Sequence, residues 1–477
     1  MPISISQDLR DLISTSPIIL PLGTSLQEAA TNMAEKGLSV FLVSDDSGNL
    51  VGIVTDQDLR VKGYAKGLSA SHKVQEIMSS PLECFPPTMN RMDALNHMLV
   101  KKRHHLVIME DGKCLGLVGK DDFIQERTHS PLFLARRVAR STQISQLTKI
   151  FSKLPQTMQA LLDEGISLRE IAPLFSHQND LILRKAVELT EKNMPTPPPQ
   201  PYVFLVLGSE GRGEQSFKTD QDNAILYQDP PAGEEESTAA WFLEYGCLLA
   251  DRLNDIGFPY CLGEIMASNP KWNQPLSKWK DYFSNWITHP TPQEVLQANI
   301  FFDFKGVYGD IILAERLEEH LTNILGQGNP IFFANLAKNA LSGKPALGFF
   351  GKLQTQSSGP HKDAIDLKKK ALALIVDITR CHALKHGIHE RGTMQRLVAL
   401  GQIKGLKICT ELLEAYFQLQ ILRIKNQLHQ IQNGREPDNH LEVGLLPQVD
   451  QAKLKASLQI IEQAQKHLLE VYAGGIL

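Results

Sequence analysis

The stretch YVFLVLGSEGRGEQSFKTDQDNAILY, residues 202–227, decides how we interpret this chain. Its first part, Tyr202 to Leu207, is an unbroken run of β-branched, aromatic and other apolar residues, which is typical of a buried strand. The run ends at Gly208-Ser209, and a second apolar run, Asn223 to Tyr227, follows a polar segment. The pattern predicts two core strands joined by a functional turn.

Two carboxylates stand at the entrance to the second strand. Asp220 and Asp222 are two residues apart, so in extended backbone both side chains lie on one face. Paired carboxylates suit Mg²⁺, which completes its shell with water and substrate phosphates. Gly208 lets the backbone approach a phosphate, and Ser209 adds a hydroxyl at an expected helix N-terminus. This layout indicates phosphoryl or nucleotidyl transfer, and a turn with surface acids is the alternative.

The same stretch resembles the DNA polymerase β-like nucleotidyltransferase superfamily, whose motif is Gly-Ser followed about ten residues later by Asp-x-Asp. More specifically, it resembles the bacterial nucleotidyltransferases that carry CBS domains, which are related to the protein-PII uridylyltransferases. The residues at family spacing are Gly208, Ser209, Arg212, Glu214, Gln215, Thr219, Asp220 and Asp222. The resemblance implies a polymerase β-like core with a mixed sheet.

The resemblance also implies roles for individual residues. Asp220 and Asp222 would be catalytic and hold Mg²⁺, while Gly208, Ser209 and Arg212 would bind the phosphates of a nucleoside triphosphate. A third carboxylate usually comes from the third strand, which we expect at residues 259–266. Glu264 is the candidate metal ligand there, with an exposed strand-end acid as the alternative.

Asp303, in the sequence FFDFKGVYGD, lies between large apolar residues. We expect it to cap a helix or to pair with Lys305 in the core, and a role in the site is the alternative.

Composition bounds the remaining function classes. With 477 residues, the chain should hold about three domains. A net charge of −4 does not favour nucleic acid as a partner. The six cysteines form no C-x-x-C pair, which indicates free thiols in a reducing compartment. We find neither a signal peptide nor a run of about 18 apolar residues, so we expect a cytoplasmic protein without a membrane span.

The N-terminal part contains an internal repeat. GIVTDQDL at 52–59 corresponds to GLVGKDDF at 116–123, an offset of 64 residues. The repeated β-α-β-β-α pattern resembles a tandem CBS (Bateman) module, which implies dimerisation and an adenine-nucleotide ligand. The family's ribose-contacting signature is present as Thr55 and Asp58 in the first copy, whereas the second copy keeps Asp122 but has Gly119 in place of the hydroxyl residue.

The rest of the chain is mostly helical in pattern. We therefore expect an α+β multidomain protein with a tandem CBS module at 1–128 (repeats at 16–65 and 74–128), a helical connector and Pro-rich linker at 129–201, a nucleotidyltransferase core at 202–310 and an all-helical C-terminal domain at 311–477. The connector helices either pack on the core or transmit a signal from the CBS module. Lys368, Lys369 and Lys370 either face the triphosphate or are simply solvated.

Taken together, the sequence predicts a signal-transduction nucleotidyltransferase. It would transfer a nucleotidyl group from a nucleoside triphosphate to an unknown acceptor, such as a protein. The CBS pair would regulate it by binding an adenine nucleotide and would form a homodimer. A catalytically inactive nucleotide-sensing protein is the alternative, and a purely structural dimerisation protein ranks last because it leaves the Asp220/Asp222 motif unused.

Overall fold

A computed structural model describes residues 9–13, 17–101, 103–119, 122, 131–217, 220–348 and 351–473. Thr219, part of the expected motif, lies outside these residues. The chain divides into two compact units, residues 1–133 and 134–477, which we describe separately. None of the described helices is both long enough and apolar enough to cross a bilayer.

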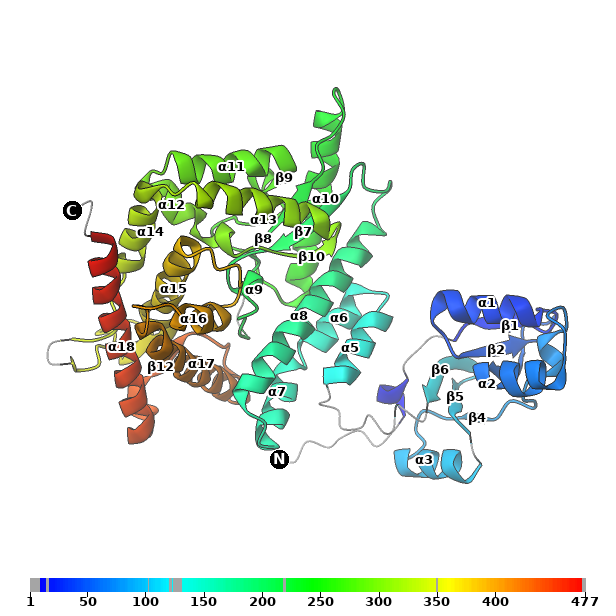
Figure 1. Cartoon of the computed structure of the whole chain (residues 1–477). Helices are drawn as coiled ribbons and strands as arrows, with labels where there is room; N and C mark the ends of the chain where they lie inside the picture. The colour runs from blue at the N-terminus through cyan, green and yellow to red at the C-terminus, as the bar shows by residue number, and fades with distance from the viewer. Residues whose placement is uncertain are drawn as a thin grey trace. The chain divides into compact units, whose positions relative to one another are not determined.

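The first unit contains the repeat that the sequence predicts (Figure 1). The first copy consists of β1 (Ile19–Pro21), α1 (Leu26–Lys36), β2 (Val40–Ser44), β3 (Leu50–Thr55) and α2 (Asp56–Asp58). The second consists of β4 (Cys84–Phe85), α3 (Arg91–Val100), β5 (His105–Glu110) and β6 (Lys113–Gly119). In each copy, the first strand pairs parallel with the second, and the second pairs antiparallel with the third. Leu42, Val107 and Leu117 join the two copies in one apolar cluster.

The second unit is built on a four-stranded mixed sheet with the order β10-β7-β8-β9. β7 (Tyr202–Val206) and β8 (Asn223–Tyr227) are the two predicted strands, and they pair antiparallel with every residue buried. β10 (Lys305–Gly309) is antiparallel to β7, while β9 (Asn273–Pro275) is parallel to β8. The predicted third strand at 259–266 is wrong, because this segment forms turns and the strand beside β8 is β9.

Helices cover both faces of this sheet (Figure 1). Before β7 come α5 (Pro131–Arg140), α6 (Ile144–Phe151), α7 (Leu154–Asp163) and α8 (Leu168–Glu191). α8 contacts β10 and α10 (Glu235–Ile256), and α6 contacts both helices, so this part of the connector packs on the core. α11 (Leu276–Thr288) and α13 (Ile311–Gly326) contact β7 or β8 from the other face.

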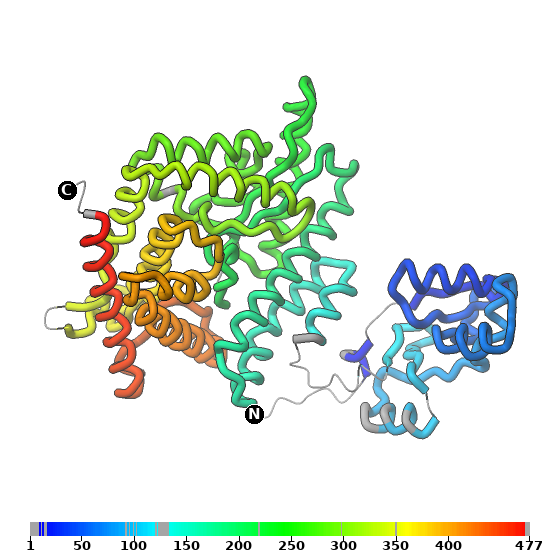
Figure 2. The backbone as a smooth tube through the Cα atoms, viewed as in Figure 1, coloured from blue at the N-terminus to red at the C-terminus, as the bar shows by residue number. Residues whose placement is uncertain are grey.

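The C-terminal region continues the same hydrophobic core. Its helices are α14 (Pro330–Ser342), α15 (Ala373–Lys385), α16 (Thr393–Gly401), α17 (Ile408–Gln432) and α18 (Gln448–Ala473), and α12 (Pro292–Ala298) precedes them. One buried cluster extends from Val203 in β7 to Leu468 in α18. Figure 2 shows α18 (red) beside helices that lie far earlier in the chain, and α14 and α15 are among its contacts.

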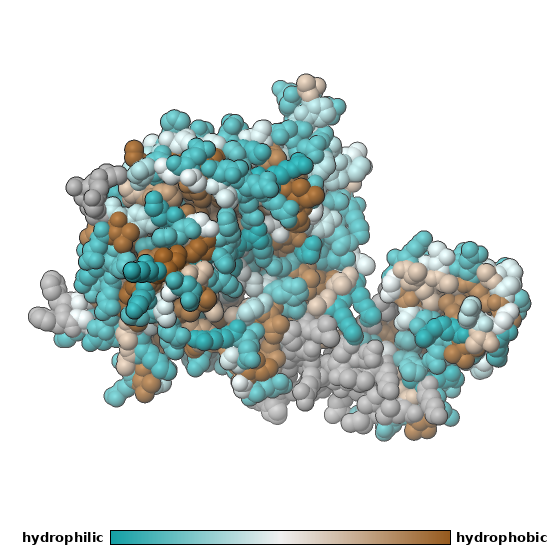
Figure 3. Space-filling model, viewed as in Figure 1, coloured by the Kyte–Doolittle hydropathy of each residue, from teal (hydrophilic) through white to brown (hydrophobic). Residues whose placement is uncertain are grey.

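A small antiparallel ribbon interrupts the helices of this region. It pairs β11 (Ala364–Asp366) with β12 (His440–Glu442). The C-terminal domain, expected to be all-helical, therefore also contains this two-stranded ribbon. The visible surface of the second unit is mainly hydrophilic, with separate apolar areas (Figure 3).

Candidate functional site

Asp220 and Asp222 lie in the extended segment immediately before β8. Gln221 between them is buried, and its Nε2 donates hydrogen bonds to the carbonyl oxygens of Ala250 and Phe258, both at 2.9 Å. This anchor holds Gln221 in the core, whereas the aspartates on either side of it are partly exposed. A carboxylate oxygen of each aspartate and the Sγ of Cys261 lie within 4.8 Å of one another. The structure therefore places the two carboxylates together.

The Gly208-Ser209 turn lies against this pair. Leu207 N donates to Asp222 O at 2.8 Å, which ties the end of β7 to the carboxylate segment. Gly208 begins the one-turn helix α9 (Gly208–Gly211) with a φ of +54°. A Cβ there would lie 2.9 Å from Ile300 Cγ1 and 3.6 Å from Asp222 Oδ2. Only glycine fits this backbone and this space, so the turn comes within contact distance of the carboxylate.

Burial shifts the acid–base behaviour of the pair. Burial and the neighbouring Asp220 carboxylate raise the pKa of Asp222 to about 6. Cys261 Sγ donates to Asp222 Oδ1 at 3.3 Å, and burial raises the pKa of this thiol, so it stays protonated at neutral pH. The donor set offered to a cation is therefore carboxylate oxygen, which fits Mg²⁺ better than a softer metal.

A cleft of about 420 Å³ opens from these residues into the C-terminal helices. Of the predicted residues, Gly208, Ser209, Arg212 and Asp222 line it, and Lys368 lines it from the segment before α15. The positive charge of Lys368 acts to lower the pKa of Asp222, against the larger effect of burial. Lys369 and Lys370 do not line this cleft. Its apolar wall comprises Ile265, Leu296, Ile300, Leu372, Ala373 and Val376.

Asp303 is the centre of a buried ionic cluster at one side of the cleft. Its side chain is completely buried, and it pairs with Arg212, Arg380 and Arg396 at 2.5–2.7 Å. Burial opposes ionisation, but the three guanidinium groups hold the pKa of Asp303 well below its ordinary value. The predicted pairing with Lys305 is wrong, because Lys305 Nζ pairs with Asp180 at 2.7 Å.

This cluster changes the interpretation of Arg212. Its Nε donates to Glu214 Oε2 and its Nη1 to Asp303 Oδ2, both at 2.7 Å, so these donors are already engaged within the protein. The cluster exists because α9 packs closely on the 3₁₀ helix Asn299–Asp303: a Cβ at Gly211 would lie 1.7 Å from Asp303 O. Arg212 therefore forms part of the cleft wall as well as of the expected phosphate site.

Arg423 of α17 is a cleft residue that the sequence reasoning missed. Its side chain is buried and lines the cleft, and its Nη2 donates to Ser216 Oγ. Its Nη1 donates to Gln420 Oε1 at 3.5 Å, and its Nε has no hydrogen-bond partner among the described residues. Burial lowers its pKa, but an arginine still remains charged at neutral pH. A charged donor left open at a cleft is suited to an anionic group.

Two further acids lie near the site, and the sequence predicted a role for only one of them, Glu264. Glu264 lies on an exposed turn with a φ of +55°, and it is not in the group formed by Asp220, Asp222 and Cys261 among the described residues. Glu210 of α9 is buried instead, and burial and Asp222 raise its pKa well above the ordinary value. Glu210 directly follows Ser209 in the sequence, and this position beside the Gly-Ser turn could have indicated that it lies near the site.

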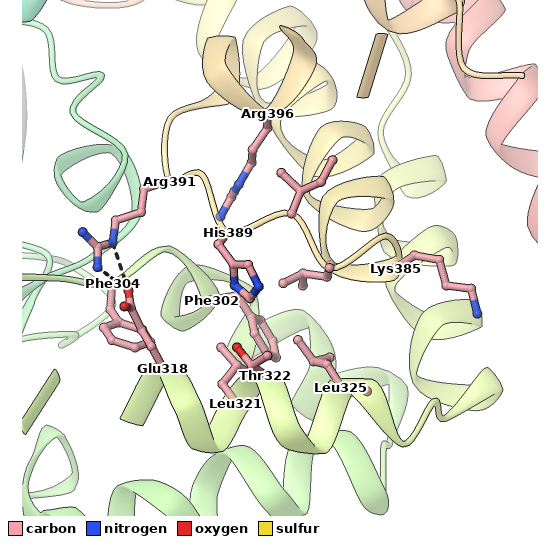
Figure 4. Close-up of a pocket in the computed structure, with 14 residues that line it drawn as sticks. Phe302, Phe304, Glu318, Leu321, Thr322, Leu325, Lys385, His389, Arg391 and Arg396 are labelled. Atoms are coloured by element: carbon pink, nitrogen blue, oxygen red, sulfur yellow. Dashed lines mark hydrogen bonds and ion pairs between the residues drawn. The ribbon is translucent and has the colours of Figure 1, made fainter. Parts of the chain in front are cut away.

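Figure 4 shows a second cavity, of about 220 Å³, with Arg396 of the Asp303 cluster among its lining residues. Phe302, Phe304, Leu321, Leu325, Leu384 and Ile388 make it largely apolar. Arg391 pairs with Glu318 at its edge, and Arg396, which binds Asp303, is also in its lining. The Asp303 cluster therefore separates the cleft from this cavity.

The two CBS copies place their predicted residues alike. Thr55 and Asp58 form a capping box in which Thr55 N donates to Asp58 Oδ2 at 2.9 Å and Asp58 N donates to Thr55 Oγ1 at 3.2 Å. In the second copy, Gly119 N donates to Asp122 Oδ2 at 2.6 Å. Asp122 thus keeps the backbone contact without the hydroxyl.

Family models match most of the chain. Residues 152–293 match "Putative nucleotidyltransferase DUF294", residues 330–472 match "Putative nucleotidyltransferase substrate binding domain", and residues 9–62 and 74–129 match the CBS domain. Curated relatives share shorter stretches. The chain is 32% identical over 98 residues to the CBS domain-containing protein CBSCBSPB2 of Arabidopsis thaliana, which covers 20% of this chain and 18% of that protein.

It is 27% identical over 114 residues to the CBS domain-containing protein YhcV of Bacillus subtilis, covering 24% of this chain and 81% of that protein. Among solved structures, it is similar to the CBS domain protein PAE2072 from Pyrobaculum aerophilum complexed with AMP. That match has 19% identity and a TM-score of 0.23 and covers 26% of this chain and 99% of that one. The chain thus spans about a fifth of the length of the first of these relatives.

Proposed function

The chain belongs to the CBS-domain-containing DUF294 nucleotidyltransferase family, and we propose that its cleft transfers a nucleotidyl group from a nucleoside triphosphate to a hydroxyl-bearing acceptor. In this reaction the acceptor oxygen forms a bond to the α-phosphorus, the bond to the bridging oxygen breaks, and pyrophosphate leaves while the hydroxyl proton is released. The convergence of Asp220 and Asp222 beside Gly208 carries this proposal.

The two aspartates would hold Mg²⁺, which supplies positive charge to phosphate oxygens in such sites. The remaining work falls to the residues of the chain. Lys368 and Arg423 reach the cleft from two directions and would bind phosphate oxygens, the arginine in bidentate fashion. The Gly208 backbone would approach the same phosphates, and Ser209 would offer its hydroxyl. Arg212 and Arg380 would be positioned by Asp303.

The apolar wall of the cleft would receive the base. Ile265, Ile300 and Val376 lie among its residues, and burying a planar base against aliphatic side chains is favourable without selecting a particular base. The acceptor would enter beside Asp220, whose carboxylate lies close to that of Asp222. A protein side chain or a small molecule would satisfy the same chemistry.

Incubation of the full chain with Mg²⁺ and each α-labelled triphosphate tests the proposal. We expect label transfer to an acceptor in cell extract, with pyrophosphate release, and loss of both in Asp220→Asn and Asp222→Asn. Triphosphate binding without pyrophosphate release in the wild type would favour the second candidate, a nucleotide-sensing protein without turnover. The position of Glu264 outside the carboxylate group is the observation that favours that candidate.

The CBS pair would regulate the cleft by binding an adenine nucleotide at Thr55 and Asp58, with Asp122 as the corresponding residue of the second copy. Regulation requires that the nucleotide binds the active and inactive states with different affinity. Equilibrium binding of labelled AMP and ATP to the wild type and to Thr55→Ala would test this site. Sedimentation of the full chain and of residues 134–477 would test whether the CBS module forms the homodimer.

A further inference from the structure

The cavity shown in Figure 4 is built between α13 and the chain that connects α15 to α16. One face of α13 lines it, because the lining residues of that helix are three or four positions apart: Glu318, Leu321, Thr322 and Leu325. His389 and Arg396 point toward this face from the other side of the cavity (Figure 4). The described residues that line the cleft and those that line this cavity do not overlap, so the two are separate sites.

The end of α15 forms the second wall. The helix ends at Lys385, and Gly387 has a φ of +63°, a backbone conformation that favours glycine. Ile388 N donates to Ala383 O at 2.9 Å, which closes the helix end as in a Schellman motif. The chain therefore leaves the helix at Gly387, and the next residues, Ile388 and His389, line the cavity.

The cavity has the size and the apolar surface to hold a small organic body. Six apolar side chains surround it: Phe302, Phe304, Leu321, Leu325, Leu384 and Ile388. Its volume of about 220 Å³ exceeds the roughly 150 Å³ of an engineered apolar cavity that binds benzene, and it is smaller than the pockets of about 300–1,000 Å³ that hold drug-sized ligands. A nucleotide is therefore too large, whereas one ring or a chain of about six carbons fits. Protein interiors rarely leave voids of this size, which is why the cavity is suited to a ligand.

The charges at the cavity favour an anionic ligand. Lys385, Arg391 and Arg396 line it, and Glu318 is the single carboxylate among its described lining residues. Arg391 is engaged with Glu318, since its Nε donates to Glu318 Oε1 at 3.0 Å. Lys385 Nζ lies 4.8 Å from the ring centroid of Phe333 on α14, which turns this charge away from the cavity. Arg396 is therefore the cation that remains to meet a ligand.

Arg396 is fixed in position but keeps one donor group open. Its side chain is only 5% exposed. Its Nε donates to Glu390 O at 2.7 Å and its Nη1 to Asp303 Oδ1 at 2.6 Å. Its Nη2 makes no hydrogen bond to any of the described residues. A guanidinium held in this way suits a carboxylate, because arginine and carboxylate form strong charge-assisted hydrogen bonds.

The other ion pairs of the Asp303 cluster leave Arg396 with the least negative charge. Arg212 has Glu214 as a second partner, and Arg380 has Asp377. Arg396 has no carboxylate partner besides Asp303 among the described residues, and it shares Asp303 with the other two arginines. A second carboxylate at Arg396 would give it the same number of partners as its two neighbours.

We propose that this cavity binds a compact apolar monocarboxylate, with the carboxylate on Arg396 and the apolar body against Phe302 and Leu321. His389 would add a ring N–H donor, since it points into the same space (Figure 4). The association is non-covalent. Because Arg396 and two arginines of the cleft wall all contact Asp303, the bound carboxylate would lie one residue away from that wall.

Binding of two probes to the full chain tests the proposal by isothermal titration calorimetry. Phenylacetate presents a ring, and hexanoate presents a chain. We expect one site per chain with a Kd below about 1 mM, which is within reach of ligands of about eight to ten non-hydrogen atoms. Phenylacetamide, which has the same size without the charge, should bind at least about tenfold more weakly because it lacks the charge-assisted hydrogen bonds.

Variants show that the probes bind in the cavity. Thr322→Trp places a large ring at the cavity wall and should weaken binding of both carboxylates at least about tenfold. Asn323→Trp is the matched control, because Asn323 is the next residue of α13, is exposed and does not line the cavity. Arg396→Gln should weaken binding of phenylacetate more than that of phenylacetamide, a difference that a general loss of folding would not produce. Arg423→Gln, in the cleft, should leave binding of all three probes unchanged.

Folding of each variant is checked by comparing its Tm with that of the wild type. Thr322 is exposed, so Thr322→Trp and its control still decide the question if Arg396→Gln fails to fold. The proposal would be overturned if neither carboxylate bound at millimolar concentration, or if phenylacetate and phenylacetamide had equal Kd values. Equal Kd values for phenylacetate in the wild type and in Thr322→Trp would overturn it as well.

Discussion

Replacement of Asp303 by asparagine should destabilise the second unit by about 3–5 kcal/mol, the usual cost of removing one partner from a buried ion pair. The charges of the cluster explain the size of this destabilisation. Arg212, Arg380 and Arg396 carry three positive charges, and Asp303, Glu214 and Asp377 carry three negative charges, so the cluster is neutral. Asparagine would leave one uncompensated buried charge. It would also accept hydrogen bonds through one oxygen instead of two.

Urea unfolding followed by tryptophan fluorescence measures this effect. All four tryptophans, Trp241, Trp272, Trp279 and Trp286, lie in the second unit, so the signal reports that unit within the full chain. Asp180→Asn is the matched control. It breaks the pair with Lys305, whose side chain is 21% exposed, and should cost less than about 1 kcal/mol. Equal losses in the two variants would refute the reasoning.

The pH dependence has a definite sign. Because the folded-state pKa of Asp303 is depressed, the carboxylate contributes its full stability above the unfolded-state pKa of about 3.9 and loses it as pH falls further. The difference in unfolding free energy between the wild type and Asp303→Asn should therefore be constant from pH 8 to pH 5 and decrease below about pH 4. A difference that grows toward acid would contradict the assignment.

Three further predictions concern the cleft. The pKa of Asp222, about 6, exceeds its unfolded value, so its ionised form opposes folding above that pH. In metal-free buffer at pH 8, Asp222→Asn should therefore raise the unfolding free energy of the second unit by on the order of 2 kcal/mol. This gain should shrink as the pH falls from 6 to 4. Urea titration at several pH values measures it. Gly208→Ala should lower the free energy of unfolding by about 1–3 kcal/mol and abolish turnover, because Gly208 has a positive φ and a Cβ there would contact Ile300. Gly233→Ala is the control, since Gly233 also has a positive φ but has open space around it, and turnover should not change. Unfolding curves and pyrophosphate release test both variants. Arg423→Gln and Lys368→Gln should each raise the KM for triphosphate about tenfold or more, because both side chains line the cleft. Lys369→Gln should leave the KM unchanged, since Lys369 does not line the cleft. Steady-state kinetics with triphosphate as the varied substrate measure these values, and equal KM values in all three variants would refute the prediction.

The parts of the fold that the sequence predicts are those encoded locally. β7 and β8 are continuous apolar runs, and the alternation of Asp220, Gln221 and Asp222 places two side chains on one side and one on the other. The same holds for the CBS repeat, where an offset of 64 residues was sufficient to identify both copies. In each case neighbouring residues carry the information.

The errors arise where distant residues decide the outcome. The segment 259–266 has a strand-like composition, but the turn at 261–264 prevents a strand, and the short polar segment Asn273–Pro275 pairs with β8 instead. Asp303 meets its three arginines across 91, 77 and 93 residues, so no local spacing could reveal them. Arg423 reaches the cleft because α17 packs there, and the residues next to it in the sequence do not predict this position.

The central claim, that Asp220 and Asp222 hold a divalent ion together with a triphosphate, can be measured directly by counting bound Mn²⁺ with electron paramagnetic resonance in the presence of a non-hydrolysable triphosphate. The account predicts Mn²⁺ binding that depends on the triphosphate and is lost in Asp220→Asn and Asp222→Asn. Equal Mn²⁺ binding in the parent and in both aspartate variants would contradict it.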